Sequence, residues 1–380
     1  MAEQPRDDLL PREPIHKITE PVQRFLHVEA ASGVLLLICT AIALILANSA
    51  AGDWYVALWK TKVGFTFGDF TMKHSLQHWI NDGLMAIFFF VVGLEVKREM
   101  VTGELRDAKR AALPVFAAIG GMVVPAGIYL LLQGGTVAAR GWGIPMATDI
   151  AFVVGCMAVL GPRVPRIMRV MLLSIAIVDD IGAILVIAIG YTESLNLTAL
   201  LLAFGGLALV YGLGRAGVRS FGIYVIIGAG VWFGFHESGV HATIAGVLMG
   251  LLTPARSYLG ENTISEMFRQ ADKTLHGGEW VNMHHRSDAV RRFTDNVREV
   301  ISPLEYLEGT LHPWTSFVIM PIFALANAGV PLDFASLKAP VAIAVMAGLL
   351  LGKPLGIVGA AWLAVKLKLA RLPEELNWRM

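Results

Sequence analysis

Apolar runs long enough to cross a bilayer recur along the chain, and they constrain its fold more than any other feature. A spanning helix needs about 20 consecutive, mostly apolar residues. The composition agrees, because 16% of the residues are charged, whereas a soluble domain carries roughly 25%. The sequence therefore predicts an all-α polytopic membrane protein with ten visible spans, at 29–48, 77–95, 112–133, 144–160, 169–190, 197–214, 220–236, 239–253, 314–330 and 340–365.

The segments between these runs predict the topology. Residues 1–28 are polar and contain several basic residues, which is unlike a cleavable signal peptide. Basic residues also crowd the links after even-numbered spans, so by the positive-inside rule both ends of the chain are cytoplasmic. The predicted parts are a cytoplasmic segment 1–28, helices one to eight in 29–253, a cytoplasmic loop with an amphipathic helix in 254–313, helices nine and ten in 314–365, and a cytoplasmic tail 366–380.

Other segments outside the spans give weaker signals. The link 49–76 contains aromatic patches that favour interfacial or hairpin structure on the outside. Cys39 and Cys156 lie in apolar runs, which is typical of buried hydrophobic residues and not of a disulfide framework. His284 and His285 lie in a polar segment, where solvated histidines are more common than metal ligands. The chain has no basic stripe with interleaved aromatics, so nucleic-acid binding is not expected.

Two adjacent carboxylates, Asp179 and Asp180, lie in the middle of the apolar run VMLLSIAIVDDIGAILVIAIG. An aspartate at the centre of a spanning helix costs roughly 2.5–3.5 kcal/mol on insertion scales, so the pair is expected to face the protein interior. Adjacent residues are about 100° apart around a helix, which allows one to face a cavity and the other a neighbouring helix. Because burial and mutual repulsion both favour protonation, the pair is suited to exchanging a proton for a cation.

Further polar residues within the apolar runs point to the same site. Thr148 and Asp149 follow Pro145 in the short fourth run, and interrupted segments of this kind indicate broken helices at a transport site. Lys353 lies in the tenth run, where a lysine is tolerated beside a carboxylate. We expect it to form a salt bridge with one of the two adjacent aspartates and to release it when sodium arrives. The alternative is that these groups only join helices by hydrogen bonds.

A second set of ionisable residues lies near the ends of the spans. Glu95 and Glu99 share one face of a helix and are expected to mark a cytoplasmic funnel. Histidines are suited to pH sensing because their charge changes near neutral pH. Each residue also has a purely structural interpretation, as a helix cap or as part of a solvated helix end. The predicted funnel and pH-sensing residues are Asp82, Glu95, Glu99, His241, Glu308 and His312.

Seven stretches, in order between about residues 20 and 374, together resemble the NhaA-type sodium/proton antiporter family. They are WINDGLMAIFFFVVGLEVKRE, AAIGGMVVPA, GIPMATDIAF, AIVDDIGAI, SGVHATIAG, LHPWTSFVIMPIFALANAGV and GKPLGI. That family is an established example of inverted-repeat transporters with broken helices. The resemblance implies a bacterial inner-membrane protein that expels sodium or lithium and takes in a larger number of protons, without a cofactor.

The resemblance also implies roles for particular residues. Asp180 is implied as the main cation ligand and Asp179 as its partner, so that both contact the transported sodium. Lys353 is implied as the proton-responsive lysine of the salt bridge. Thr148 and Asp149 are implied in the unwound part of helix four. The pH response is implied to involve a cytoplasmic cluster of Glu95, Glu99, Glu308 and His312, with His241 as a modulating residue.

Two features depart from the family pattern. The family has twelve helices, so the last two, including a second broken helix, are expected to be missing from this sequence. The loop 254–313 is longer than the link usual at that position. Members of the family often form homodimers through a β-hairpin between helices one and two, which the link 49–76 is expected to supply.

The leading hypothesis is an electrogenic sodium(lithium)/proton antiporter, regulated by pH, which is a secondary active transporter and not an enzyme. The sequence contains no GxxxxGK[ST] motif, which would indicate ATP binding. The alternatives are a sodium-coupled symporter of related fold, an intramembrane aspartyl protease and a transport-inactive structural protein. A symporter needs an organic-anion site, for which no dedicated arginine lies within the membrane. A protease needs its aspartates on two facing helices.

Overall fold

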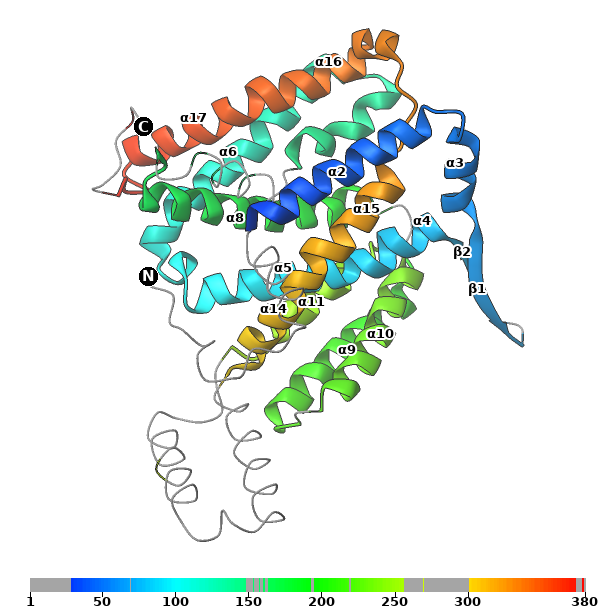
Figure 1. The fold of residues 1–380 in the computed structure, drawn as a ribbon. Coiled ribbons are helices and arrows are strands. Elements are labelled where there is room, and N and C mark those ends of the chain that lie inside the picture. The colour runs from blue at the N-terminus through cyan, green and yellow to red at the C-terminus, as the bar shows by residue number, and fades with distance from the viewer. Residues whose placement is uncertain are drawn as a thin grey trace, which may run out of the picture.

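The structure is a computed structural model that describes residues 29–68, 70–147, 163–192, 195–218, 220–255 and 301–373, together with residues 153, 157, 160, 269 and 378. Within these residues the chain is mostly helical (Figure 1). Six helices are long and apolar enough to cross a membrane, and a bent helix pair makes seven if it is counted as one span. The prediction of a helical polytopic protein is therefore confirmed, while the count of ten spans stays a prediction.

The first described elements are the bent helix pair and a β-hairpin. Helices α2 (Glu29–Ala47) and α3 (Gly52–Lys60) are bent relative to one another by 114°. Strands β1 (Lys62–Phe67) and β2 (Phe70–Ser75) pair antiparallel and project beyond the helices in Figure 1. Gly68 in the turn has φ +59°, a left-handed conformation that glycine adopts without a Cβ clash. The hairpin expected in the first link is thus confirmed.

The remaining elements are helical, and several follow one another without a break. The six spans are α4–η1–α5, α6, α8, α9, α14–η6–α15 and α16–η8–α17. The bounds are α4 (Leu76–His78), η1 (Trp79–Leu84), α5 (Met85–Val101), η2 (Glu104–Arg106), α6 (Ala108–Gln133), η3 (Val137–Met146), α8 (Arg166–Gly190), α9 (Leu197–Arg215), α10 (Phe221–Ser238), α11 (Thr243–Leu252), α14 (Pro303–Trp314), η6 (Thr315–Ile319), α15 (Met320–Asn327), η7 (Phe334–Lys338), α16 (Pro340–Ala347), η8 (Gly348–Gly352) and α17 (Lys353–Lys366).

Three of these spans contain a π-helical turn, namely η1, η6 and η8. In two of them a proline follows closely, Pro321 after η6 and Pro354 after η8. A proline has no N–H, and its ring clashes with the carbonyl four residues earlier, which the wider π turn accommodates. Such turns are frequent at functional sites, and η8 ends directly before Lys353.

The ninth predicted span begins earlier than expected. Helix α14 begins at Pro303, not at residue 314, because Ser302 caps it. The Ser302 hydroxyl accepts a hydrogen bond from the Glu305 N–H, and the Glu305 carboxylate accepts one from the Ser302 N–H. Because this capping box starts a helix at Pro303, the loop that was predicted to extend to residue 313 ends earlier. The amphipathic helix expected in that loop lies largely outside the described residues.

Two other predicted spans differ in their described parts. The run predicted at 239–253 forms a helix only from Thr243, because Gly239 has a left-handed conformation, φ 80°, that ends α10. The run predicted at 144–160 begins within the 3-10 segment η3, which ends at Met146. The residues expected to continue it lie mostly outside the described part of the chain.

Large apolar side chains cover the outside of the helices. Leu131 is 87% exposed, Ile226 is 75% exposed and Leu350 is 72% exposed. Contiguous apolar surface of this kind promotes association in water, whereas lipid tails match it. The residues between the helices include many small ones, which allow close helix packing. Both features fit a bundle that lies in a bilayer.

Candidate functional site

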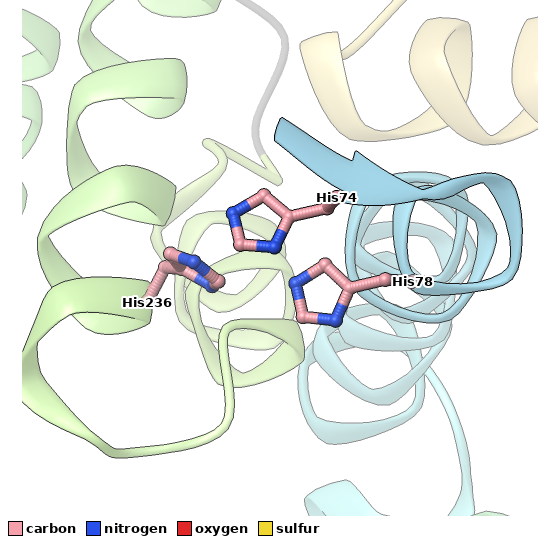
Figure 2. A group of neighbouring side chains, drawn as sticks. All are labelled: His74, His78 and His236. Carbon is pink, nitrogen blue, oxygen red and sulfur yellow. The ribbon is translucent and has the colours of Figure 1, made fainter. Parts of the chain in front are cut away.

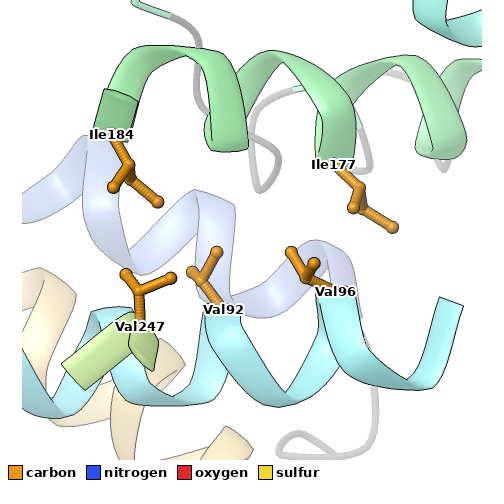
Figure 3. Close-up of a cluster of buried hydrophobic side chains, with 5 residues drawn as sticks. All are labelled: Val92, Val96, Ile177, Ile184 and Val247. Carbon is orange, nitrogen blue, oxygen red and sulfur yellow. The ribbon is translucent and has the colours of Figure 1, made fainter. Parts of the chain in front are cut away.

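Helix α8 carries both central aspartates, and its packing decides how they point. Ile177 and Ile184 of α8 lie in a buried apolar cluster with side chains of α5 and α11 (Figure 3). Asp180 is three residues after Ile177 and four before Ile184, so it shares that face of α8. Asp179 is rotated by about 100° from it and is only 3% exposed. The cluster consists of Val92, Val96, Ile177, Ile184 and Val247.

Asp179 forms an ion pair with Lys353, the first residue of α17. The Lys353 Nζ donates a hydrogen bond of 2.7 Å to Oδ2 of Asp179 and a short one to the backbone carbonyl of Met146. Lys353 is only 7% exposed. The expected salt bridge of this lysine is therefore present, and its partner is Asp179. The second acceptor, the backbone carbonyl of Met146, belongs to the last residue of η3, and this contact was not expected from the sequence.

A close contact between two helices sets the position of Lys353. A Cβ atom added to Gly356 of α17 would lie 2.1 Å from the backbone oxygen of Gly120 in α6. One added to Gly120 would lie 2.2 Å from the backbone oxygen of Gly356. The two backbones therefore touch where neither residue has a side chain, as is common between membrane helices. Because Lys353 precedes Gly356 by three residues, it lies on the same face of α17 against α6, and its ammonium reaches Asp179 of α8 from there.

The ion pair holds opposite charges in a nearly dry environment. Removing one partner of such a pair typically costs about 3–5 kcal/mol, because the other is left as an uncompensated buried charge. A cation that approaches Asp179 and Asp180 therefore competes with the Lys353 ammonium for the same carboxylate. The geometry thus allows the lysine ammonium and a cation to exclude one another at this carboxylate.

A second polar cluster joins α5 to α14. Arg98 forms an ion pair with Glu308, and Nδ1 of His312 lies 3.4 Å from Oε1 of Glu95. The expected proximity of Glu95, Glu308 and His312 is therefore found, and Arg98 is an additional member. The carboxylates are less exposed than their partners. His312 is charged only when it is protonated, so only that form makes an ion pair with Glu95.

Glu99, four residues after Glu95 on α5, contacts the helix that carries the aspartates. The hydroxyl of Ser174 donates a hydrogen bond of 3.5 Å to Oε1 of Glu99. Ser174 is buried and lies five residues before Asp179 on α8. The serine was missed in the sequence, since an isolated serine in an apolar helix gives no signal. It provides a polar contact between α5 and α8.

Asp82 and His241 lie away from that cluster. Asp82 is 13 residues before Glu95 in the same continuous span, which corresponds to about 20 Å along a helix. Its Oδ2 lies 3.4 Å from Nδ1 of His236 and 3.6 Å from Nε2 of His78. His241 is exposed and follows the end of α10 that bears His236. Asp82 and His241 therefore do not share the contacts of the α5–α14 cluster, and their predicted parts in the funnel and the pH response stay predictions.

Thr148 and Asp149 lie outside the described residues, so their predicted place in a broken helix four stays a prediction. The described chain stops next to them, at Ala147, where η3 gives way to extended backbone. The carbonyl of Met146, just before this point, contacts Lys353. The described part of this run therefore already reaches the buried ion pair.

Apolar spans that enclose a buried aspartate–lysine pair place the chain among ion-translocating membrane proteins, because ionisable residues inside a membrane mark ion and proton pathways. The family model described as Na+/H+ antiporter 1 matches residues 23–380, and the chain belongs to that family.

Curated relatives agree with this assignment. The chain is 56% identical to the Na(+)/H(+) antiporter NhaA of Rhodopirellula baltica, over 97% of this chain and 84% of that protein. It is 48% identical to the Na(+)/H(+) antiporter NhaA of Rhizobium meliloti, over 98% of this chain and 85% of that protein. It is 51% identical to the Na(+)/H(+) antiporter NhaA 2 of Myxococcus xanthus, over 94% of this chain and 77% of that protein. The chain is therefore a multi-pass membrane transporter and not an enzyme, and the resemblance to this family is confirmed.

Proposed function

We propose that this Na+/H+ antiporter binds its cation at Asp179 and Asp180, with Lys353 as the competing positive charge. The buried 2.7 Å ion pair between Lys353 and Asp179 supports this proposal more than any other observation. Hard cations prefer oxygen ligands, and two adjacent carboxylates supply them. Asp180 is the main cation ligand, and Asp179 passes from Lys353 to the cation. The transported species are Na+, Li+ and H+, and no cofactor takes part.

Charge balance then explains the coupling. In the proton-loaded state Lys353 is protonated and paired with Asp179, and Asp180 holds a second proton. Sodium replaces both protons when it binds the two carboxylates. One sodium ion therefore exchanges for two protons, which makes transport electrogenic. The exchange is driven by the proton gradient, so the protein is a secondary active transporter.

Transport proceeds by alternating access within the family's inverted-repeat fold. Thr148 and Asp149 belong to the broken helix four that completes the site. The protein lies in the bacterial inner membrane with its N-terminus in the cytoplasm, consistent with the basic links. A homodimer forms through the hairpin β1–β2, which projects beyond the helices (Figure 1).

The cluster between α5 and α14 is the proposed cytoplasmic pH sensor. Its members Glu95, Glu308 and His312 hold the two helices together by charge. Loss of the proton from His312 weakens the contact with Glu95, and Glu99 transmits the change to α8 through Ser174. His241 modulates the response from the other end of the bundle.

Sodium-induced proton movement in proteoliposomes tests the site. A dye that reports the internal pH should respond to sodium with the wild-type protein and not with Asp180→Asn. Asp179→Asn should reduce the response, because the lysine then has no carboxylate to release. Asp333→Asn is the matched control, since Asp333 is an exposed aspartate at the start of η7, outside the proposed site. Full exchange by Asp180→Asn would show that the cation ligand is wrongly assigned.

A further inference from the structure

Three histidines from separate elements meet at the base of the hairpin (Figure 2). His74 is on β2, His78 is on α4 and His236 is in the last turn of α10. Each is half-buried and offers one ring nitrogen, and these three nitrogens all lie within 4.8 Å of one another. The ring centroids of His74 and His78 are 4.3 Å apart, and those of His74 and His236 are 5.4 Å apart.

We propose that His74, His78 and His236 bind a divalent transition-metal ion of the Zn2+ class. Imidazole suits Zn2+, Cu2+ and Ni2+, whereas sodium prefers oxygen ligands. In a tetrahedral zinc site with N ligands the nitrogens are about 3.4 Å apart. The three ring nitrogens all lie within 4.8 Å of one another, so small side-chain rotations suffice to bring them to that spacing. This site is separate from the transport site and does not rest on the proposed antiport mechanism.

A carboxylate completes the group. Oδ2 of Asp82 lies 3.4 Å from Nδ1 of His236 and 3.6 Å from Nε2 of His78. It is placed to be a fourth ligand or to orient the rings, as carboxylates do beside zinc-bound histidines. In the described part of the chain Nε2 of His78 is buried without a hydrogen-bond partner. A metal ion would satisfy this nitrogen.

Two tryptophans hold the cluster in place. Trp232 stacks on His236, and its indole N–H donates a 3.0 Å hydrogen bond to the backbone oxygen of Asp82. Trp79 stacks on Trp232 and donates a 2.9 Å hydrogen bond to the backbone oxygen of Val63 in β1. The ligands thus rest on a supporting shell, as metal sites require. A bound ion would fasten the hairpin to α10.

The test is Zn2+ titration of the purified full chain, made without a polyhistidine tag and followed by calorimetry. The wild-type protein should bind one Zn2+ at this site. His78→Gln and His236→Gln should each weaken binding at least about ten-fold, since even outer-shell changes weaken metal sites by about 10- to 100-fold. The double variant His284→Ala/His285→Ala is the control. It removes two consecutive histidines outside the proposed site and should leave the Zn2+ affinity unchanged.

Two further readouts guard against misfolded variants. The metal-free melting temperatures of the variants should match the wild type, and Zn2+ should raise only that of the wild type and the His284/His285 control. The Co2+-loaded wild type should show the intense visible absorption of four-coordinate nitrogen ligation. Unchanged Zn2+ affinity in His74→Ala/His78→Ala/His236→Ala would overturn the proposal, as would a wild-type protein that binds no Zn2+ at micromolar concentrations.

Discussion

Loss of the Lys353 ammonium should destabilise the fold strongly, because it leaves Asp179 as a buried charge. Both side chains of the pair are less than a tenth exposed, and their atoms are 2.7 Å apart. Solvent screening is therefore weak, and Lys353→Ala should lower the free energy of unfolding by about 3–5 kcal/mol at neutral pH.

A double-mutant cycle separates the charge effect from packing. The cycle compares Lys353→Met and Asp179→Asn, each alone, with the double variant. The double variant removes both charges, so its loss of stability should be smaller than the sum of the two single losses by at least about 1 kcal/mol. Unfolding is measured in detergent by denaturant titration with intrinsic fluorescence. Lys338→Ala, at an exposed lysine in η7, is the control and should change stability by no more than about 0.5 kcal/mol. Additive single costs, or a Lys353→Ala protein as stable as the wild type, would refute the reasoning.

Three other perturbations test the surrounding structure. Gly356→Ala places a Cβ 2.1 Å from the backbone oxygen of Gly120 and should destabilise the protein by about 1–3 kcal/mol. The Cβ of Gly359→Ala meets nothing within 4 Å, so this variant should be as stable as the wild type. Equal melting temperatures of the two variants would contradict the contact between Gly356 and Gly120. His312→Ala removes the proton-dependent partner of Glu95 and should shift the pH profile of dye-reported exchange toward acid, and an unchanged profile would exclude it as a sensor. Replacing residues 62–75 by a short flexible link should abolish the dimer measured by cross-linking in membranes, while a persistent dimer would exclude the hairpin as its basis.

The sequence was informative where a physical penalty had only a few solutions. Asp179, Asp180 and Lys353 could be singled out because charges in an apolar span are costly unless they meet partners. The choice of Asp179 as the lysine's partner was not predictable. It depends on the rotation of α8, which the cluster around Ile177 and Ile184 sets through contacts distant in sequence.

Other features were hidden for similar reasons. The start of α14 at Pro303 was missed because polar residues around the Ser302 capping box resemble a loop. The contact of Asp82 with His236 depends on how α10 packs against the start of the α4–η1–α5 span. The convergence of His74, His78 and His236 depends on the way the hairpin meets α10 (Figure 2). Local pattern indicates the elements, whereas tertiary packing decides their neighbours.

The central claim is that sodium and protons compete for one site built from Asp179, Asp180 and Lys353. Proton release on addition of sodium to the purified protein, in weakly buffered detergent solution, tests it most directly. The account predicts that sodium releases protons from the wild type, that Asp180→Asn releases none, and that Asp333→Asn behaves as the wild type. Sodium-dependent proton release by Asp180→Asn equal to that of the wild type would contradict the account.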